Sequence, residues 1–264
     1  TGMADRNRFV IAVDGFCDEN AEQLFADGVK LFPTRVFIGG VPIDPPTSNS
    51  ERDRILAVSK TSENTVIPSV AGEYERFFDA VLDERDGGDL IFITPSVCYA
   101  PALAAAKNCM VKFYGSNVFV LSAFGAGAAI VPLLELAQNA LSRGENAQST
   151  FSELSFAAKN LVSGAILPNG GFASYKIMRY DNGFELDRLS RGEAKTAAIV
   201  AAEVKSSGTR CVYISHAGNY GFVGKIATAI AETSPEVKIK AGFCSPATLA
   251  VTSPRAVTIG FLKG

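Results

Sequence analysis

The sequence predicts an α/β protein of two domains: first a parallel sheet covered by helices on both sides, then a mixed sheet covered by helices on one side. Strand-like and helix-like segments alternate through the N-terminal half, a polar stretch at residues 142–150 interrupts them, and a hairpin signature follows. Alternating strands and helices are typical of parallel sheets, whereas a hairpin brings antiparallel strands into a sheet. We therefore predict an N-terminal domain over residues 1–149 and a C-terminal domain over residues 150–264.

The N-terminal half is interpreted from residues 89–110. Leu90 to Ile93 is a continuous apolar run, which suits a strand buried on both faces. Residues 94–96 break the run, and an alanine-rich helix is expected from about residue 101. Further strands are expected at 8–13, 31–38 and 118–121, and loops at 41–49 and 61–69. Helices are expected at 50–58 and 72–85. Asp18 or Asn20 is expected to cap one more helix, and another is expected after residue 125, which either bends or begins at Pro132.

The C-terminal half contains a different pattern. Residues 176–180 and 184–189 flank Asp-Asn-Gly, which is a hairpin signal. Helices are expected at 150–161, 193–206 and 220–231, and strands at 211–215, 237–243 and 257–261. A hairpin combined with strand–helix units predicts a mixed sheet with helices on one face.

Composition excludes several classes of function. The net charge is only -2 and no basic block is present, so we expect no nucleic-acid partner. The first six residues do not resemble a signal peptide, so we expect a cytoplasmic protein. Residues 113–134 carry no charge, but Asn117, Ser122 and Pro132 interrupt them, so we expect no stable membrane insertion.

Cysteine and histidine usage argues against metal sites and disulfides. Five cysteines are spread without a close-spaced pair, and His216 is the single histidine. We expect reduced cysteines, a locally hydrogen-bonded His216, no metal and no cofactor. Cys98 lies in a turn before a helix, where a thiol can become a nucleophile. No base is identifiable beside it, so we expect no catalytic residue, and we keep an enzyme that uses Cys98 as an alternative.

Hydroxyl side chains gather on two turns that follow expected strands or loops. Thr65 and Ser69 lie in one turn, and Thr94 and Ser96 lie in the other. If the turns converge, these hydroxyls can hold a carboxylate by neutral hydrogen bonds. The alternative is that each one caps the helix that follows it, as serine and threonine commonly do.

The order of these segments resembles the DegV family, bacterial proteins that bind fatty acids. Its motifs are, in order, a strand ending in Asp-Ser-Thr, a Thr-Ser-Gln-Pro-Ser loop, a Ser-Ser-x-Leu-Ser-Gly-Thr turn, a Leu-x-x-Gly-Gly-Arg-Ile segment and a Gly-Pro-Gly element. The corresponding residues here are 14–16, 65–69, 94–100, 161–166 and 253–257. The resemblance covers most of the chain, and each motif is kept in part.

The resemblance implies a three-layer α/β/α domain, a two-layer α/β domain with a mixed sheet, and a fatty acid whose carboxylate lies in the cleft and whose tail lies in the second domain. Thr65 matches the threonine that holds the carboxylate, and Cys98 stands where the family has serine. Val251 matches a histidine that contacts the ligand in the family. The arginine of the Gly-Gly-Arg segment, in the region that faces a partner kinase, is replaced near Ala165. Arg255 is a candidate substitute cation.

We therefore predict a non-catalytic carrier of a long-chain fatty acid, held in a buried apolar tunnel. The expected ligand-binding residues are Thr65, Ser69, Thr94, Ser96, Cys98 and Arg255. We expect a fatty acid kinase, the family's partner, to use this protein inefficiently, because the arginine and histidine are absent. Two alternatives stay open: a small-molecule enzyme that uses the cleft and Cys98, and a binding module for another apolar or anionic ligand.

Overall fold

Three sheets organise the chain in the computed structural model, which describes residues 9–46, 48–84, 88–95, 100–110, 112–113, 118–170, 174–180 and 184–264. The first is the expected parallel sheet, with strand order β2-β1-β6-β7. Its strands are β1 (Val10–Asp14), β2 (Lys30–Phe32), β6 (Leu90–Pro95) and β7 (Val118–Ala123). Every residue of β1 and β6 is buried, as the continuous apolar runs predicted.

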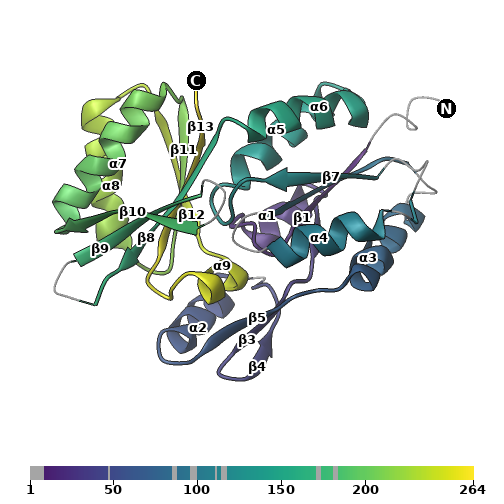
Figure 1. Ribbon diagram of the computed structural model, residues 1–264, viewed down its shortest axis with the longest axis horizontal. Coiled ribbons are helices and arrows are strands. Elements are labelled where there is room, and N and C mark those ends of the chain that lie inside the picture. Colours follow the sequence, from purple (N-terminus) through teal and green to yellow (C-terminus); the bar gives the residue numbers. More distant parts are fainter. Residues whose placement is uncertain are drawn as a thin grey trace.

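Helices cover both faces of the parallel sheet. One face carries α3 (Ala71–Asp83) and α4 (Ala100–Cys109), and the other carries α1 (Ala21–Ala26), α5 (Val131–Ser142) and α6 (Ala147–Ala158). In Figure 1, α5 and α6 lie above β1 and β7, and α3 and α4 lie below them. The three-layer prediction is confirmed.

Each face of the parallel sheet has its own apolar core. Under α3, Phe32 and Phe92 pack against Tyr74 and Phe78, and the Phe32 and Tyr74 rings stack with centroids 4.1 Å apart. The helical spacing of the aromatic residues of α3 presents them to the sheet on one stripe. On the other face, α5 contributes a core of small and branched residues and begins with Pro132 in its first turn, where proline is tolerated.

The second sheet has six strands in the order β10-β9-β8-β13-β11-β12. They are β8 (Leu161–Pro168), β9 (Ser174–Tyr180), β10 (Phe184–Arg191), β11 (Cys211–His216), β12 (Lys238–Phe243) and β13 (Val257–Leu262), with helices α7 (Glu193–Ser207) and α8 (Tyr220–Thr233) on one face. Only β11 and β12 pair in parallel. The predicted mixed sheet, the predicted hairpin strands and the single helical layer are confirmed.

The third sheet corrects three sequence predictions. It consists of β4 (Val41–Ile43), β3 (Arg35–Ile38) and β5 (Asn64–Ile67), all antiparallel, beside α2 (Asn49–Ser59). The expected single strand at 31–38 is two strands, because the chain passes from one sheet to another at residues 33–34. Segments expected as loops at 41–49 and 61–69 each contain a strand. β4 pairs with the neighbouring β3 across the two-residue turn Gly39-Gly40, a local hairpin that the sequence analysis missed. β5 pairs with β3 from a distant part of the chain, which local composition does not indicate.

A short helix near the C-terminus joins the two halves. α9 (Pro246–Val251), which the sequence did not predict, packs against β3 and β5 of the N-terminal half. Ser245 is the N-cap of this helix, and its hydroxyl accepts a hydrogen bond from the Thr248 N–H. Figure 1 shows α9 between the second sheet and α2. The last elements of the chain therefore lie on elements formed by its first quarter.

The two α/β units meet where β13 crosses the turn between β7 and α5. A Cβ added at Gly260 would lie 2.3 Å from the Cα of Ala129, which is too close for any side chain. Backbone therefore packs directly on backbone at this junction. The predicted domain boundary at residue 149 falls inside α6 and remains a prediction.

The uncharged stretch at residues 113–134 is not one helix. It contains β7 and the start of α5, with residues 114–117 outside the described part. Among the described residues, no helix combines the length and the apolar character that crossing a bilayer requires.

Candidate functional site

A buried carboxylate lies at the carboxyl end of β1. Asp14 has no exposed surface, and Thr34 Oγ1 donates to its Oδ1 over 2.6 Å. Tyr74 Oη and Thr94 Oγ1 both donate to Oδ2 over 3.2 Å. Burial raises the pKa of Asp14, and these hydrogen bonds partly counteract the rise. Asp14 thus fixes the ends of β1 and β6 and the connection between β2 and β3.

This network determines what Thr94 can offer a ligand. A hydroxyl has a single hydrogen to donate. The Thr94 hydroxyl donates it to Asp14, and the Thr94 side chain has no exposed surface. The hydroxyl therefore has no hydrogen left to donate to a ligand.

The other predicted ligand-binding residues lie in different environments. Thr65 is exposed on β5, paired with Phe37, whereas Ser69 is buried in the turn before α3. Arg255 is exposed and forms no ion pair within the described residues. Its backbone oxygen accepts a hydrogen bond from Asn219 Nδ2 over 2.7 Å.

Ser96 and Cys98 lie outside the described residues. Within the described part, no hydrogen bond links Thr65, Ser69, Thr94 and Arg255 to one another. The assignment of these six residues to a ligand therefore stays a prediction.

A second buried carboxylate joins the two units. Asp18 is 5% exposed; its Oδ1 accepts the Ser245 N–H over 2.7 Å and its Oδ2 accepts the Thr258 hydroxyl over 3.0 Å. Burial raises the pKa of Asp18 to about 6, although these hydrogen bonds lower it. The sequence analysis proposed Asp18 or Asn20 as the cap of the next helix, and Asn20 is the residue that caps α1. The signal that could have singled out both carboxylates is an aspartate that ends a fully buried strand, Asp14, followed by a second aspartate after the next turn, Asp18.

Asp18 also lines a cavity of about 280 Å³ between the units. Its walls are the β1–α1 turn, β3, the segment from β4 to α2, and the β12–α9 turn. Arg52 of α2 stacks on the Phe243 ring, with its guanidinium carbon 3.4 Å from the ring centroid, and bonds to Asp53 over 2.9 Å. The cavity therefore has carboxylates on one wall and a cation on another.

His216 is packed behind this cavity. Its ring centroid is 4.7 Å from that of Phe243, and its Nδ1 accepts the Gly218 N–H over 3.0 Å. Burial, and secondarily the charge of Arg52, lower the pKa of His216. The expected local hydrogen bond is confirmed, and the bond leaves the proton of the neutral ring on Nε2.

The described cysteines are free thiols, and three of them have raised pKa values. Burial raises the pKa of Cys109 to about 11 and raises those of Cys17 and Cys244 as well. None of these three is a thiolate near neutral pH. Across the described residues, no group of three or more His, Cys, Asp or Glu side chains is arranged to hold a metal ion.

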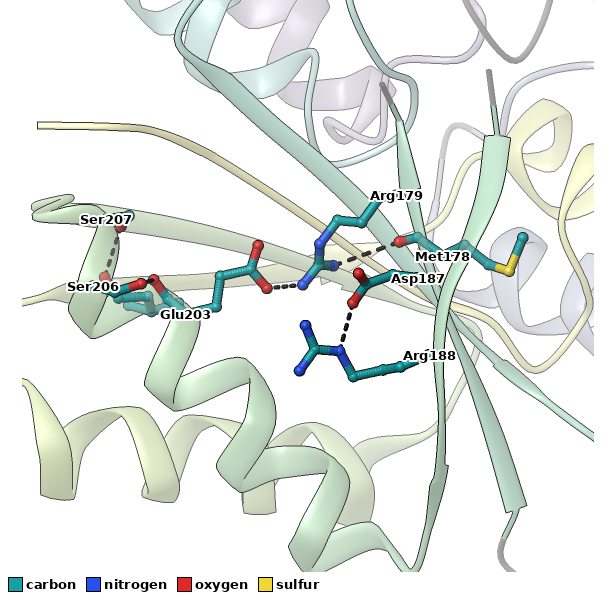
Figure 2. A network of polar contacts seen from close by, with 8 residues as sticks. Met178, Arg179, Asp187, Arg188, Glu203, Ser206 and Ser207 are labelled. Carbon is teal, nitrogen blue, oxygen red and sulfur yellow. Dashed lines mark hydrogen bonds and ion pairs between the residues drawn. The ribbon is translucent and has the colours of Figure 1, made fainter. Parts of the chain in front are cut away.

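A second hollow, of about 610 Å³, lies between the β9–β10 hairpin and α7. Figure 2 shows its polar network: Arg179 of β9 pairs with Glu203 of α7, and Arg188 Nε donates to Asp187 over 2.6 Å. Gly164 leaves room for the Arg179 guanidinium, since a Cβ there would lie 2.7 Å from Nη1. The Arg179–Glu203 pair joins the hairpin to α7, and the polarity of this hollow does not suit an acyl chain.

The space between the second sheet and its helices is apolar and filled. Val200, Ile214, Ile226 and Phe261 are each at most 3% exposed there. This apolar layer lies away from the polar groups of the cavity. It can surround a hydrocarbon chain only if these side chains move apart.

The sequence matches no family model and no curated protein, but solved structures share its fold. A DegV lipid-binding protein from Thermotoga maritima is 16% identical and has a TM-score of 0.83, with 97% of this chain and 98% of that chain covered. A DegV family protein from Eubacterium eligens, loaded with heptadecanoic acid, is 12% identical and has a TM-score of 0.80, with 97% and 100% covered.

The fatty acid kinase B3 protein of Streptococcus pneumoniae, loaded with linoleic acid, is similar to the same extent. It is 12% identical and has a TM-score of 0.79, with 97% of this chain and 100% of that chain covered. At such identities a structural likeness establishes the fold and leaves the ligand open. The chain therefore has the two-domain α/β fold of the DegV proteins over nearly its full length.

Proposed function

We propose that this chain is a divergent DegV protein that binds a long-chain fatty acid without transforming it. One observation carries the proposal: the fold matches, over 97% of the chain, proteins whose structures hold linoleic or heptadecanoic acid. The order of the sequence motifs supports the same conclusion independently of the fold.

The acyl tail is proposed to enter the apolar layer of the second unit. Burying a methylene group contributes about 0.8 kcal/mol, so a tail of roughly fifteen carbons gains on the order of 12 kcal/mol. Association and ordering cost roughly 4–15 kcal/mol. Moving Val200, Ile226 and their neighbours apart adds to that cost. The affinity for the fatty acid therefore depends on the contacts of its carboxylate head group as well as on burial of the tail.

The carboxylate is proposed to lie near Thr65 and Ser69, with the turn that contains Ser96 and Cys98 beside it. A buried carboxylate needs hydrogen bonds or a countercharge. Thr94 does not donate to the carboxylate in this proposal, because its hydroxyl hydrogen is already donated to Asp14. The exposed guanidinium of Arg255 is the proposed countercharge.

Mass spectrometry of an organic extract of the purified protein tests the proposal directly, and calorimetry with oleate tests it on delipidated protein. Thr65→Val should weaken oleate binding by about 1–3 kcal/mol, because one hydroxyl donor is lost. Thr61→Val is the matched control: Thr61 is also exposed, and its hydroxyl donates to the Val58 backbone oxygen. Lipid-free protein that ignores oleate, or an unchanged affinity in Thr65→Val, contradicts the proposal.

We further propose that a fatty acid kinase uses this protein inefficiently. Ala165 and Val251 stand where the resemblance places an arginine and a histidine, and arginine is the residue type that orients phosphate by paired hydrogen bonds. Acyl phosphate formation should be slower than with a family member that keeps both residues, measured at equal fatty acid loading. Equal rates would show that other residues serve the kinase.

A further inference from the structure

The hollow between the β9–β10 hairpin and α7 lies apart from the cavity between the two units. No residue lines both, and none of the buried residues of the apolar layer under α7 and α8 lines the hollow. In Figure 1 the hairpin and α7 lie at the left, far from β1 and β7. The wall on α7 includes Ala198 and Ala202, one helical turn apart, whose small side chains leave the space unfilled. The hollow is therefore separate from the site proposed for the fatty acid.

A β-bulge in β10 brings two consecutive charged side chains to this hollow. The pairing with β9 shifts between Leu186 and Arg188, which leaves Asp187 without an opposite residue. Consecutive residues of a regular strand face opposite sides of the sheet, but Asp187 and Arg188 both line the hollow. Bulges of this kind occur next to functional sites, because they redirect a side chain.

The charges that line the hollow have a positive excess. Three cations come from three elements, Arg179 of β9, Arg188 of β10 and Lys195 of α7, and the two carboxylates are Asp187 and Glu203. Each carboxylate is already paired, Asp187 with Arg188 and Glu203 with Arg179. Lys195 forms no ion pair within the described residues. Its ammonium is the charge left without a counterpart.

The guanidinium group of Arg188 also has donors to spare. Only its Nε bonds to Asp187, and its terminal nitrogens, which carry most of its N–H groups, form no hydrogen bond within the described part of the chain. Figure 2 shows these nitrogens on the side of Arg179 and α7. Burial lowers the pKa of Arg179; the charge of Asp187 opposes this effect, and the charge of Arg188 lowers the pKa further. Two guanidinium groups thus repel each other here, and an anion between them would relieve the repulsion.

We propose that this hollow binds a small molecule through a phosphate group, which the terminal nitrogens of Arg188 and the ammonium of Lys195 hold, with Arg179 beside them. A phosphate group presents three acceptor oxygens to donors on three elements, whereas a carboxylate presents two in one plane. A cavity of about 150 Å³ holds one benzene molecule, and the hollow, at about 610 Å³, has roughly four times that volume. An uncharged organic body therefore fits against Ala198 and Ala202.

The experiment compares probes that share a benzene ring and differ in the head group. Calorimetry with the full chain would measure phenyl phosphate, benzoate and benzyl alcohol at a pH above the second phosphate pKa of about 6. We expect phenyl phosphate to bind about tenfold more tightly than benzoate, which has less charge and fewer oxygens, and benzyl alcohol not to bind. Phenyl phosphate that does not bind, or that benzoate equals in affinity, overturns the proposal.

Two variants remove one cation each. Arg188→Gln and Lys195→Gln should each weaken phenyl phosphate binding about tenfold, because a charged donor is lost. Both side chains are exposed, so the fold should tolerate the changes. Lys176→Gln is the matched control, since Lys176 is an exposed cation of β9 that does not line the hollow, and it should leave the affinity unchanged. Equal affinities in the parent, Arg188→Gln and Lys195→Gln would place the phosphate elsewhere and overturn the proposal.

A second pair of variants adds one negative charge at two places. Ala198 and Ala231 are both exposed on helices, and only Ala198 lines the hollow. Ala198→Glu should abolish phenyl phosphate binding, whereas Ala231→Glu on α8 should leave it unchanged. Equal losses would mean that the net charge of the protein, and not this hollow, attracts the phosphate, and would overturn the proposal.

Oleate binding measured on the same variants separates the hollow from the proposed fatty acid site. None of the substituted residues belongs to the apolar layer, so we expect each variant to keep the oleate affinity of the parent protein. Phenyl phosphate binding in a protein that ignores oleate supports the hollow and rejects the fatty acid proposal. Oleate that displaces phenyl phosphate competitively shows a shared site and overturns the separation argued here.

Discussion

Asp18 should make the stability of this protein depend on pH in an unusual direction. Its carboxylate is 5% exposed and is held by the Ser245 N–H and the Thr258 hydroxyl, with no cation among its partners. Burial penalises the charged form and raises the pKa from 3.8 to about 6 in the folded state. The replacement Asp18→Asn keeps an acceptor oxygen and removes the titration.

The sign and size follow from the two pKa values. The folded state binds the proton more tightly than the unfolded chain, so protonation stabilises the folded state. That contribution is fully present below a pH of 3.8 and is lost as the pH rises through about 6. A pKa difference of about 2 corresponds to roughly 3 kcal/mol, because each pKa unit is 1.36 kcal/mol.

The assay is urea denaturation of the parent and Asp18→Asn at several pH values. The unfolding free energy of the parent, relative to that of the variant, should rise by roughly 3 kcal/mol between neutral pH and about pH 4. Glu236→Gln, which changes an exposed carboxylate, should show almost no such difference. The buried Asp14 titrates in the parent and in both variants, so most of its effect cancels in the comparison.

Neighbouring groups do not mimic the expected result. The thiols of Cys17 and Cys244 have pKa values raised by burial, so they stay protonated throughout this range. Glu19 lies next to Asp18 in the turn and is retained in both proteins. Parallel stability curves for the parent and Asp18→Asn would refute the argument, because they would mean that Asp18 has the same pKa in the folded and unfolded chains.

Three further substitutions test other parts of the chain. Gly260→Ala should lower the unfolding free energy by about 3 kcal/mol in urea denaturation, because its Cβ would lie 2.3 Å from the Ala129 Cα. A Cβ added at Gly221, which lies in α8, would have no neighbour within 4 Å, so Gly221→Ala should instead stabilise the protein by up to about 1 kcal/mol. Equal losses of unfolding free energy in the two variants would contradict the packing argument. Cys98→Ser should leave oleate affinity nearly unchanged in calorimetry, and a turnover that this variant abolishes would show that Cys98 is a nucleophile.

Local patterns in the sequence predicted most of the regular structure. The apolar run of β6 and the aromatic stripe of α3 indicated elements that the structure contains. The strands 176–180 and 184–189 pair as expected around their turn, which itself lies outside the described residues. Such patterns are readable because side-chain periodicity reports which face of a strand or helix is buried.

The antiparallel sheet of β3, β4 and β5 was not readable in this way. Thr65 lies opposite Phe37, and the strands are short and partly exposed, so neither has a clear apolar alternation. The sequence analysis consequently placed Thr65 in a loop, whereas it lies on a strand. The position of Thr65 relative to Ser69 and Thr94 depends on the pairing of β5 with β3.

The sequence by itself determined the fold class, the parallel sheet, the mixed sheet and the buried end of β1, because these depend on hydrophobic patterns within short segments. Only the tertiary structure decided what surrounds Asp18. Its two hydrogen-bond donors, Ser245 and Thr258, lie 227 and 240 positions further along the chain. Contacts over such separations arise from how whole sheets pack, and no local pattern of residue types encodes them.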